Sequence, residues 1–144
     1  MARGSISGAQ FTSAATAAAA TVGLGYVPDF AIYIQATAAT NPNIYIWVDK
    51  TKFGVADADS LNDDVFLITG STGVITKTEG ISRHNGGTLV TASNDQDTYL
   101  PDGTNMVAGD RTVPGLSIAA AIQTNSGHNI IFAGQGAGLI KPVV

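Results

Sequence analysis

The chain has 144 residues, no cysteine, a formal net charge of −4 and charged side chains at only 12 % of its positions, against about 25 % in an ordinary soluble chain. The lack of cysteine excludes disulfides, thiolate nucleophiles and cysteine-based zinc sites. Seven Lys and Arg residues with a pI near 4.7 argue against a nucleic-acid-binding surface, and an apolar content of 44 % excludes a chain that is disordered throughout.

Short segments of alternating, β-branched and aromatic residues follow one another along the chain, with turn residues between them. The segments expected to form strands are 30–35, 44–48, 65–68, 74–77, 88–91, 116–123 and 129–133. No helical period accompanies them. The alanine-rich segment Ser13–Val22 has no amphipathic stripe and runs into Gly23, so we expect it to be extended. The pattern predicts an all-β fold, a single antiparallel β-sandwich or jelly-roll-like domain.

Two turns are expected from their composition. Thr37–Asn43 is predicted to be a hairpin loop, because Pro42 cannot donate a hydrogen bond within a central strand. Asn125-Ser126-Gly127 is predicted to be a tight hairpin turn, because Asn and Gly adopt the positive φ values that such turns require.

The expected boundaries are an N-terminal arm over residues 1–10, a β-sandwich over residues 11–136 and a C-terminal tail over residues 137–144. We expect the two arms to dock on neighbouring chains. The polar stretch between Gln96 and Pro114 is long for a connection and is expected to be functional or part of an interface. No signal peptide is expected, and the longest run of small residues is too short to span a membrane.

The search for reactive groups gives few candidates. The acidic segment Asp57–Asp64 does not follow the EF-hand pattern, so a solvated acidic turn is favoured and ion binding stays open. His84 and His128 each lie beside turn residues. The glycines of residues 134–138 follow a strand as a dinucleotide-binding loop does, but Leu139 replaces the third glycine and too few residues remain for a helix. We therefore expect no enzyme activity, no cofactor and no metal site.

Alternation in the strand around Trp47 places Tyr45 and Trp47 on one face and three aliphatic side chains, Ile44, Ile46 and Val48, on the other. If the aliphatic face is the core, then Tyr45 and Trp47 point outward, and a subunit contact is favoured over a carbohydrate because aromatic side chains are enriched in interface cores. A strand buried on both faces would give the same pattern. The sequence leaves both possibilities open.

Three motifs carry a resemblance. Residues 25–29 form a Gly-aromatic-x-Pro-Asp step after a Thr/Ala-rich segment, residues 46–48 form a Trp-containing strand, and Gly115-Leu116-Ser117-Ile118 leads into a final strand that ends near Gly134. With these motifs, the chain resembles a group of small virion proteins of tailed bacteriophages over most of its length.

The resemblance implies a capsid decoration (cement) protein, made in the host cytoplasm and located on the outer capsid surface of the virion. Its partners would be the major capsid protein and further copies of itself, since such proteins are commonly trimers, and neither nucleic acid nor a membrane is expected to bind. A fibre or tail domain that binds host surface glycan is the alternative. The residues expected at interfaces are Ile6, Tyr45, Trp47, Tyr99, Leu100, Arg111, Leu139 and Ile140.

Overall fold

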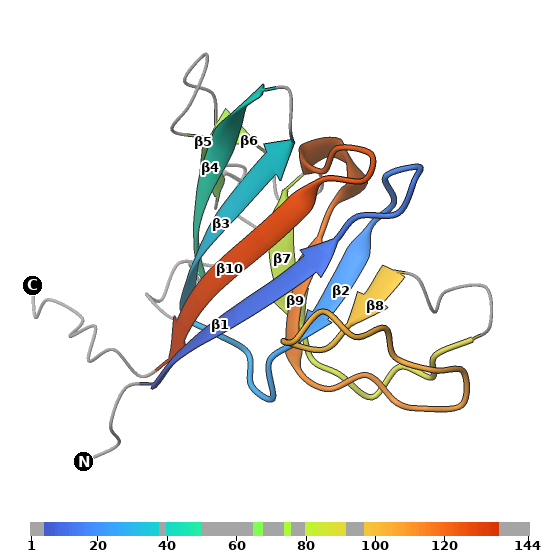
Figure 1. Cartoon of the computed structure of the whole chain (residues 1–144). Coiled ribbons are helices and arrows are strands. Elements are labelled where there is room, and N and C mark those ends of the chain that lie inside the picture. Colours follow the sequence, from blue (N-terminus) through green and yellow to red (C-terminus); the bar gives the residue numbers. More distant parts are fainter. Residues whose placement is uncertain are drawn as a thin grey trace, which may run out of the picture.

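The structure is a computed structural model that describes residues 5–37, 40–49, 65–67, 74–75, 80–91 and 97–135. These residues form two β-sheets that pack face to face, with a single 3₁₀ turn and no α-helix among them (Figure 1). The prediction of an all-β sandwich is confirmed. No helix in the described ranges is long and apolar enough to cross a membrane.

The larger sheet has six strands in the order β1-β10-β3-β4-β5-β6, and each neighbouring pair is antiparallel. Its strands are β1 (Ser5–Thr12), β10 (His128–Gln135), β3 (Phe30–Thr37), β4 (Thr40–Val48), β5 (Val65–Leu67) and β6 (Val74–Ile75).

The smaller sheet has four strands in the order β7-β9-β2-β8. Its strands are β7 (Ile81–His84), β9 (Gly115–Ile118), β2 (Ala20–Gly23) and β8 (Thr98–Tyr99). The pairs β7-β9 and β9-β2 are antiparallel, whereas β2 and β8 are parallel, so the smaller sheet is mixed at this edge.

The core lies between the two sheets, and the largest side chain in it is Trp47. Trp47 on β4 pairs with Ala31 on β3, which in turn pairs with Ala133 on β10. Two small side chains in the same cross-strand row leave the volume that the indole fills, as close packing of a sandwich interior requires. The next row places Ile131, Tyr33 and Tyr45 side by side, and the two tyrosine rings stack with their centroids 5.5 Å apart.

Several predicted boundaries change. Residues 5–10 of the predicted N-terminal arm belong to β1 and pair with β10 of the same chain, because Ala9 and Phe11 bury their side chains in the core. The segment 13–22 contains no helix, as predicted, and β2 begins at Ala20. The tail over residues 137–144 lies outside the described residues.

Pro42 does not lie in a loop but within β4. The β3-β4 register shifts between Gln35 and Thr37, and Pro42 lies in β4 beside this irregularity. Bulges are among the places in a sheet where proline, which lacks an N–H, is tolerated.

The turn at Asn125-Ser126-Gly127 exists, but it does not close a hairpin. Ser126 has a φ of +50°, and Asn125 accepts a hydrogen bond from the backbone N–H of Ala17 at 2.7 Å. The strand before this turn, β9, belongs to the smaller sheet, and the strand after it, β10, belongs to the larger sheet. A 3₁₀ turn at Ala120–Ile122 carries the chain between them, so the turn joins the two layers of the sandwich.

Candidate interaction surface

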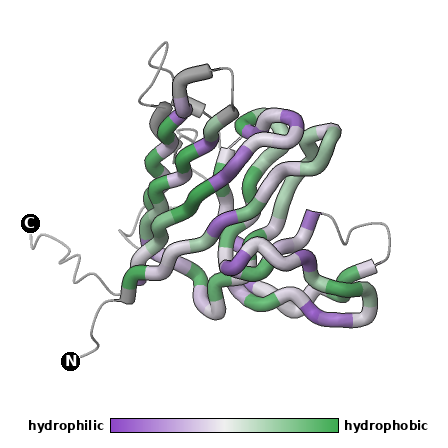
Figure 2. The backbone as a smooth tube through the Cα atoms, viewed as in Figure 1, coloured by the Kyte–Doolittle hydropathy of each residue, from purple (hydrophilic) through white to green (hydrophobic). Residues whose placement is uncertain are grey.

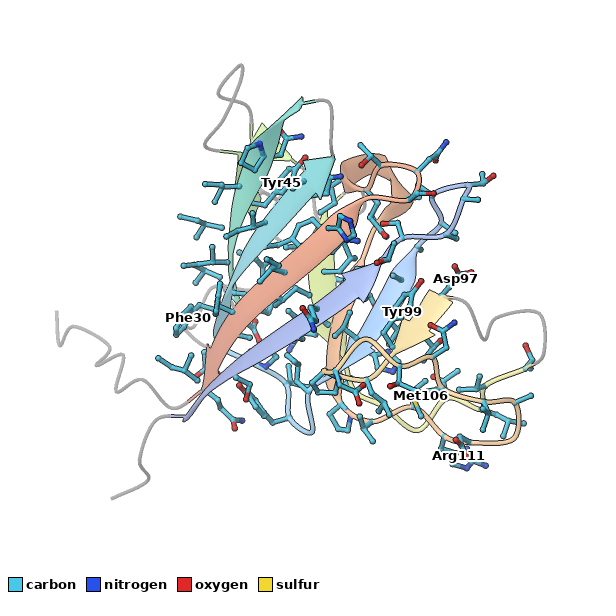
Figure 3. All side chains as sticks on the ribbon, in the orientation of Figure 1. Phe30, Tyr45, Asp97, Tyr99, Met106 and Arg111 are labelled. Carbon is cyan, nitrogen blue, oxygen red and sulfur yellow. The ribbon has the colours of Figure 1, made fainter. Side chains whose placement is uncertain are left out.

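The outer face of the larger sheet, which points away from the core, is built almost entirely from apolar side chains. Three cross-strand rows cross β10, β3 and β4 in register: Ile130-Ile34-Ile44, Phe132-Ile32-Ile46 and Gly134-Phe30-Val48. We call these rows, together with Ile6 on β1, the outer apolar face. In Figure 3 the Phe30 side chain points away from the smaller sheet, and the tube in Figure 2 is rich in hydrophobic colour along these strands.

Part of this face is exposed to water. Ile6 is 76 % exposed, Phe132 is 45 % exposed and Ile130 is 41 % exposed, while the remaining side chains of the rows are half-buried. None of the described outward-facing positions on β1, β10, β3 and β4 is Asp, Glu, Lys or Arg. An apolar patch of this extent on a soluble domain is typical of a site that binds another macromolecule.

The two outer faces of the sandwich differ sharply. On the smaller sheet, the outward row consists of Thr21, Ser117 and Ser82, which pair across β2, β9 and β7. These hydroxyl side chains remain compatible with water. Of these two outer faces, at the described positions, the face of the larger sheet gains the more free energy by being covered.

The position of the Phe30 ring explains why residue 134, within the outer apolar face, is a glycine. A Cβ atom at Gly134 would lie 2.4 Å from the Phe30 ring, so the ring covers the backbone of β10 at this point. Gly8 on β1 is different, because among the described residues a Cβ there would meet only the Ile131 carbonyl oxygen, at 4.0 Å. Gly8 pairs with Phe132, whose ring does not cover it. Gly8 also lines an open hollow of about 290 Å³ with Ala9, Gln10, Pro101 and Ile130, so the half-exposed Phe132 ring has a hollow at its paired residue.

An open groove of about 750 Å³ adjoins the outer apolar face where the loop after β8 approaches β1. The groove is lined by the side chains or backbone of Gln10, Phe11, Thr12, Ala14, Tyr99, Asp102, Gly103, Asn105, His128, Asn129 and Ile130. The Gln10 N–H donates to the Pro101 carbonyl at 2.9 Å, and a Cβ at Gly103 would lie 2.9 Å from the Gln10 carbonyl oxygen. Gly103 also has a φ of +87°, so glycine allows the loop to seal this part of the β1 edge.

The loop at the groove is ordered by its own hydrogen bonds. Leu100 donates to the Thr104 carbonyl, Gly103 donates to the Leu100 carbonyl, and the Asp102 carboxylate accepts the Thr104 N–H at 2.9 Å. This last bond lowers the pKa of Asp102. The carboxylate is therefore a turn-forming group.

A buried polar cluster lies below the groove and joins both sheets. Asn129 donates to the carbonyls of Phe11 and Gly127 and to Ser13 Oγ, and it accepts the Tyr33 hydroxyl at 2.5 Å. Ser13 continues the cluster by donating to Gln123, whose amide donates to the carbonyls of Ala18 and Ile118. Burial raises the pKa of Tyr33, which keeps its hydroxyl a neutral donor.

The residues predicted at interfaces lie in different parts of the structure and do not form one surface. Ile6 lies on the outer apolar face and Arg111 is exposed, where its guanidinium donates to the Gly87 carbonyl at 2.7 Å. Figure 3 shows Arg111 and Phe30 at opposite sides of the molecule, so these residues do not form one surface. Leu100 is half-buried, and Leu139, Ile140 and the acidic segment Asp57–Asp64 lie outside the described residues.

Of the two possibilities left open for Tyr45 and Trp47, the outward orientation is wrong, and with it their expected place at an interface. Tyr45 is 5 % exposed and Trp47 is 1 % exposed, and both belong to the core. The aliphatic side chains of the same strand face outward instead. Tyr99 is also buried, because its ring stacks on Phe11 with centroids 4.5 Å apart and its hydroxyl donates to the Thr12 carbonyl.

The side chains that sequence reasoning missed are the outward aliphatic and aromatic ones of β3, β4 and β10. A signal for them exists in the sequence. In the segment Phe30–Gln35, one phase of the alternation is Phe30, Ile32 and Ile34, and the other begins with Ala31 and Tyr33. Both phases are therefore largely apolar, which is the pattern of a strand with two apolar faces.

Titratable groups do not converge in the part of the chain that the structure describes. No group of three or more His, Asp or Glu residues there could hold a metal ion. His84 Nε2 lies 2.8 Å from Thr112 Oγ1 and burial lowers the pKa of His84, whereas His128 lines the groove. Arg83 and the buried Asp49 form an ion pair at 3.8 Å that joins the two sheets.

The fold and this surface define an all-β sandwich with one uncharged, apolar outer face. A scan of protein-family models, a search of curated proteins and a search of solved structures each returned no match for the chain.

Proposed function

We propose that this chain is a structural subunit of a bacteriophage virion, and that its particular role is capsid decoration. In this role it binds the outer surface of the head and stabilises contacts between major capsid subunits. It is made in the host cytoplasm, functions in the virion and works through surface contact, without catalysis.

The outer apolar face is the observation that carries the proposal. Burying apolar surface contributes about 25 cal/mol per Å², so rows of Ile, Val and Phe side chains favour association strongly. A protein that acts alone gains nothing from such a face and risks aggregation through it. A subunit of a permanent assembly, by contrast, uses it as a contact.

The charge and the motifs support the virion as the assembly. A net charge of −4 suits a protein on the outside of a particle, where no genome has to be neutralised. The motifs at residues 25–29, 46–48 and 115–118 resemble those of small phage virion proteins. Many symmetric copies on a particle would add avidity to each contact.

A fibre or tail domain that binds host glycan is the second candidate, and the groove beside β1 favours it. Gln10, Asp102, Asn105 and His128 supply the polar groups that a sugar requires. However, both aromatic rings at the groove, Phe11 and Tyr99, are buried against each other and offer no exposed face for a sugar to stack on. Decoration is therefore the better-supported role.

Co-sedimentation with heads of a tailed phage that lack the protein tests the proposal. The purified chain should pellet with the heads and increase their resistance to heat. Because few charges are available, binding should weaken little between low salt and about 0.5 M salt. Binding that collapses as salt rises, or heads that leave the chain in solution, would contradict the proposal, and glycan-array binding without head binding would favour the second candidate.

A further inference from the structure

The outer apolar face also bears on how copies of this chain meet one another. We propose that the outer apolar face is a contact between copies of this chain, with Phe132 of one copy seated in the hollow at Gly8 of its neighbour. The resemblance to phage virion proteins implies trimers but gives no contact surface, whereas this inference names one. It does not depend on the proposed function, because it concerns the purified chain alone.

The first argument is charge. Close to a symmetry axis, each residue of a homo-oligomer faces its own counterpart, so a charged side chain there meets a like charge. The chain carries a net charge of −4, yet no described outward position on β1, β10, β3 and β4 is Asp, Glu, Lys or Arg. A face whose centre lies at a symmetry axis is favoured by this property, whereas recognition of a charged partner favours charged residues on the face.

The second argument is shape. The face combines a ring that protrudes into solvent, Phe132, with an adjacent hollow at Gly8 that no described side chain fills. The cross-strand pair of Phe30 and Gly134 in the same sheet differs from the pair of Phe132 and Gly8, because the Phe30 ring covers Gly134. The exposed ring and the open glycine are complementary across two copies, where burying the ring removes apolar area from water.

The third argument is the position of the face within the molecule. The outward hydroxyl row of the smaller sheet, Thr21-Ser117-Ser82, offers no comparable gain on burial. The described outer end of the apolar rows is closed by the polar side chains of Gln10, Thr12 and His128. An apolar centre with a polar rim is the usual anatomy of a protein interface.

Sedimentation equilibrium of the purified chain tests the proposal. The wild type should have a mass of at least two 14.6 kDa chains, and three chains is the number that the resemblance implies. Phe132→Glu should weaken association at least about 100-fold, because it places like charges in the contact. The matched control is Ser117→Glu, which puts the same charge on the outer face of the smaller sheet and should leave the mass unchanged.

The variant Gly8→Leu distinguishes specific seating of the Phe132 ring from non-specific association of apolar surfaces. It makes the face more apolar, so a non-specific surface would associate more strongly, whereas seating of Phe132 in the hollow would be blocked and association weakened. Far-ultraviolet circular dichroism checks each variant for folding, and Phe132→Ser replaces Phe132→Glu if the latter does not fold. A monomeric wild type at about 100 μM, a mass that Phe132→Glu and Phe132→Ser both leave unchanged, or tighter association of Gly8→Leu would overturn the proposal.

Discussion

Asn129 is the side chain that ties the polar interior to the two sheets. It is almost completely buried, and each of its amide atoms is used: Nδ2 contacts Phe11 O at 3.3 Å, Ser13 Oγ at 2.8 Å and Gly127 O at 3.0 Å, while Oδ1 accepts from Tyr33. A fully satisfied cluster of this kind stabilises one arrangement of the strands, because any alternative leaves buried polar atoms without partners.

Substitution of these partners should therefore be costly and coupled. Asn129→Ala should lower the free energy of unfolding by about 2–4 kcal/mol, and Tyr33→Phe by about 1–2 kcal/mol, because each leaves buried groups unpaired. The double variant should cost less than the sum of the two. Urea unfolding of the four proteins gives the coupling, and strictly additive costs would show that the pair does not interact.

His84 gives the fold a predictable dependence on pH. Burial lowers the pKa of His84 in the folded chain, whereas in the unfolded chain the imidazole takes up its proton near its ordinary value of about 6.5. As pH falls below that value, the unfolded state binds more protons than the folded state, so the free energy of unfolding decreases. The stabilisation is present above pH 6.5 and is lost as pH falls through the lower, folded pKa.

The measurement compares the wild type with His84→Gln by urea unfolding between about pH 7.5 and pH 5. The variant keeps a side chain that can hydrogen-bond to Thr112 but cannot titrate, so its free energy of unfolding should fall less over this range. Equal slopes for the two proteins would show that His84 does not carry this part of the pH dependence.

At the scale of elements, β9 and β2 approach each other closely at Gly115. A Cβ at Gly115 would lie 1.9 Å from the Val22 carbonyl oxygen, so glycine alone fits where β9 enters the smaller sheet. Gly8, also in a strand, has open space at the same point of its backbone.

These two glycines form a matched pair for mutagenesis. Gly115→Ala should lower the free energy of unfolding by about 2–4 kcal/mol, because the strands have to separate to admit the methyl group. Gly8→Ala should change it by less than about 1 kcal/mol, since the methyl group meets no backbone and alanine restricts the unfolded chain. Thermal unfolding of both variants measures the two changes. Equal decreases in the free energy of unfolding would contradict the close packing of β9 against β2.

The elements also show what the sequence can and cannot predict. Alternation is local, and it located β3, β4, β5 and β10 well. Alternation does not show which side of β4 faces the core, because both alternating sets of side chains in β4 are apolar. The orientation depends on Ala31 and Ala133, which lie in other strands and leave room for Trp47. The sheet to which β9 and β10 each belong depends on long-range pairing, so the local turn residues at Asn125 predict a hairpin although the chain changes sheets there.

At the scale of the whole molecule, the two sheets give the sandwich two unlike sides. The outer face of the smaller sheet carries hydroxyl side chains. The outer face of the larger sheet carries rows of Ile, Val and Phe, with no Asp, Glu, Lys or Arg at the described outward positions. A sandwich that needed only to be stable would gain nothing from this asymmetry. The candidate site is thus the whole outer face of a sheet. It can be recognised only once it is known which set of alternating side chains points into the core.

The central claim is that the outer apolar face is covered when the protein is assembled. The chain has no cysteine, so Ile34→Cys on β3, the central strand of the outer apolar face, and Ser117→Cys on the opposite outer face each introduce one thiol. The rate of reaction with a maleimide is measured for both over a dilution series. At concentrations where the protein assembles, Ile34→Cys should react at least about tenfold more slowly than after dilution, while Ser117→Cys should not change. Equal rates for Ile34→Cys at every concentration would contradict the claim.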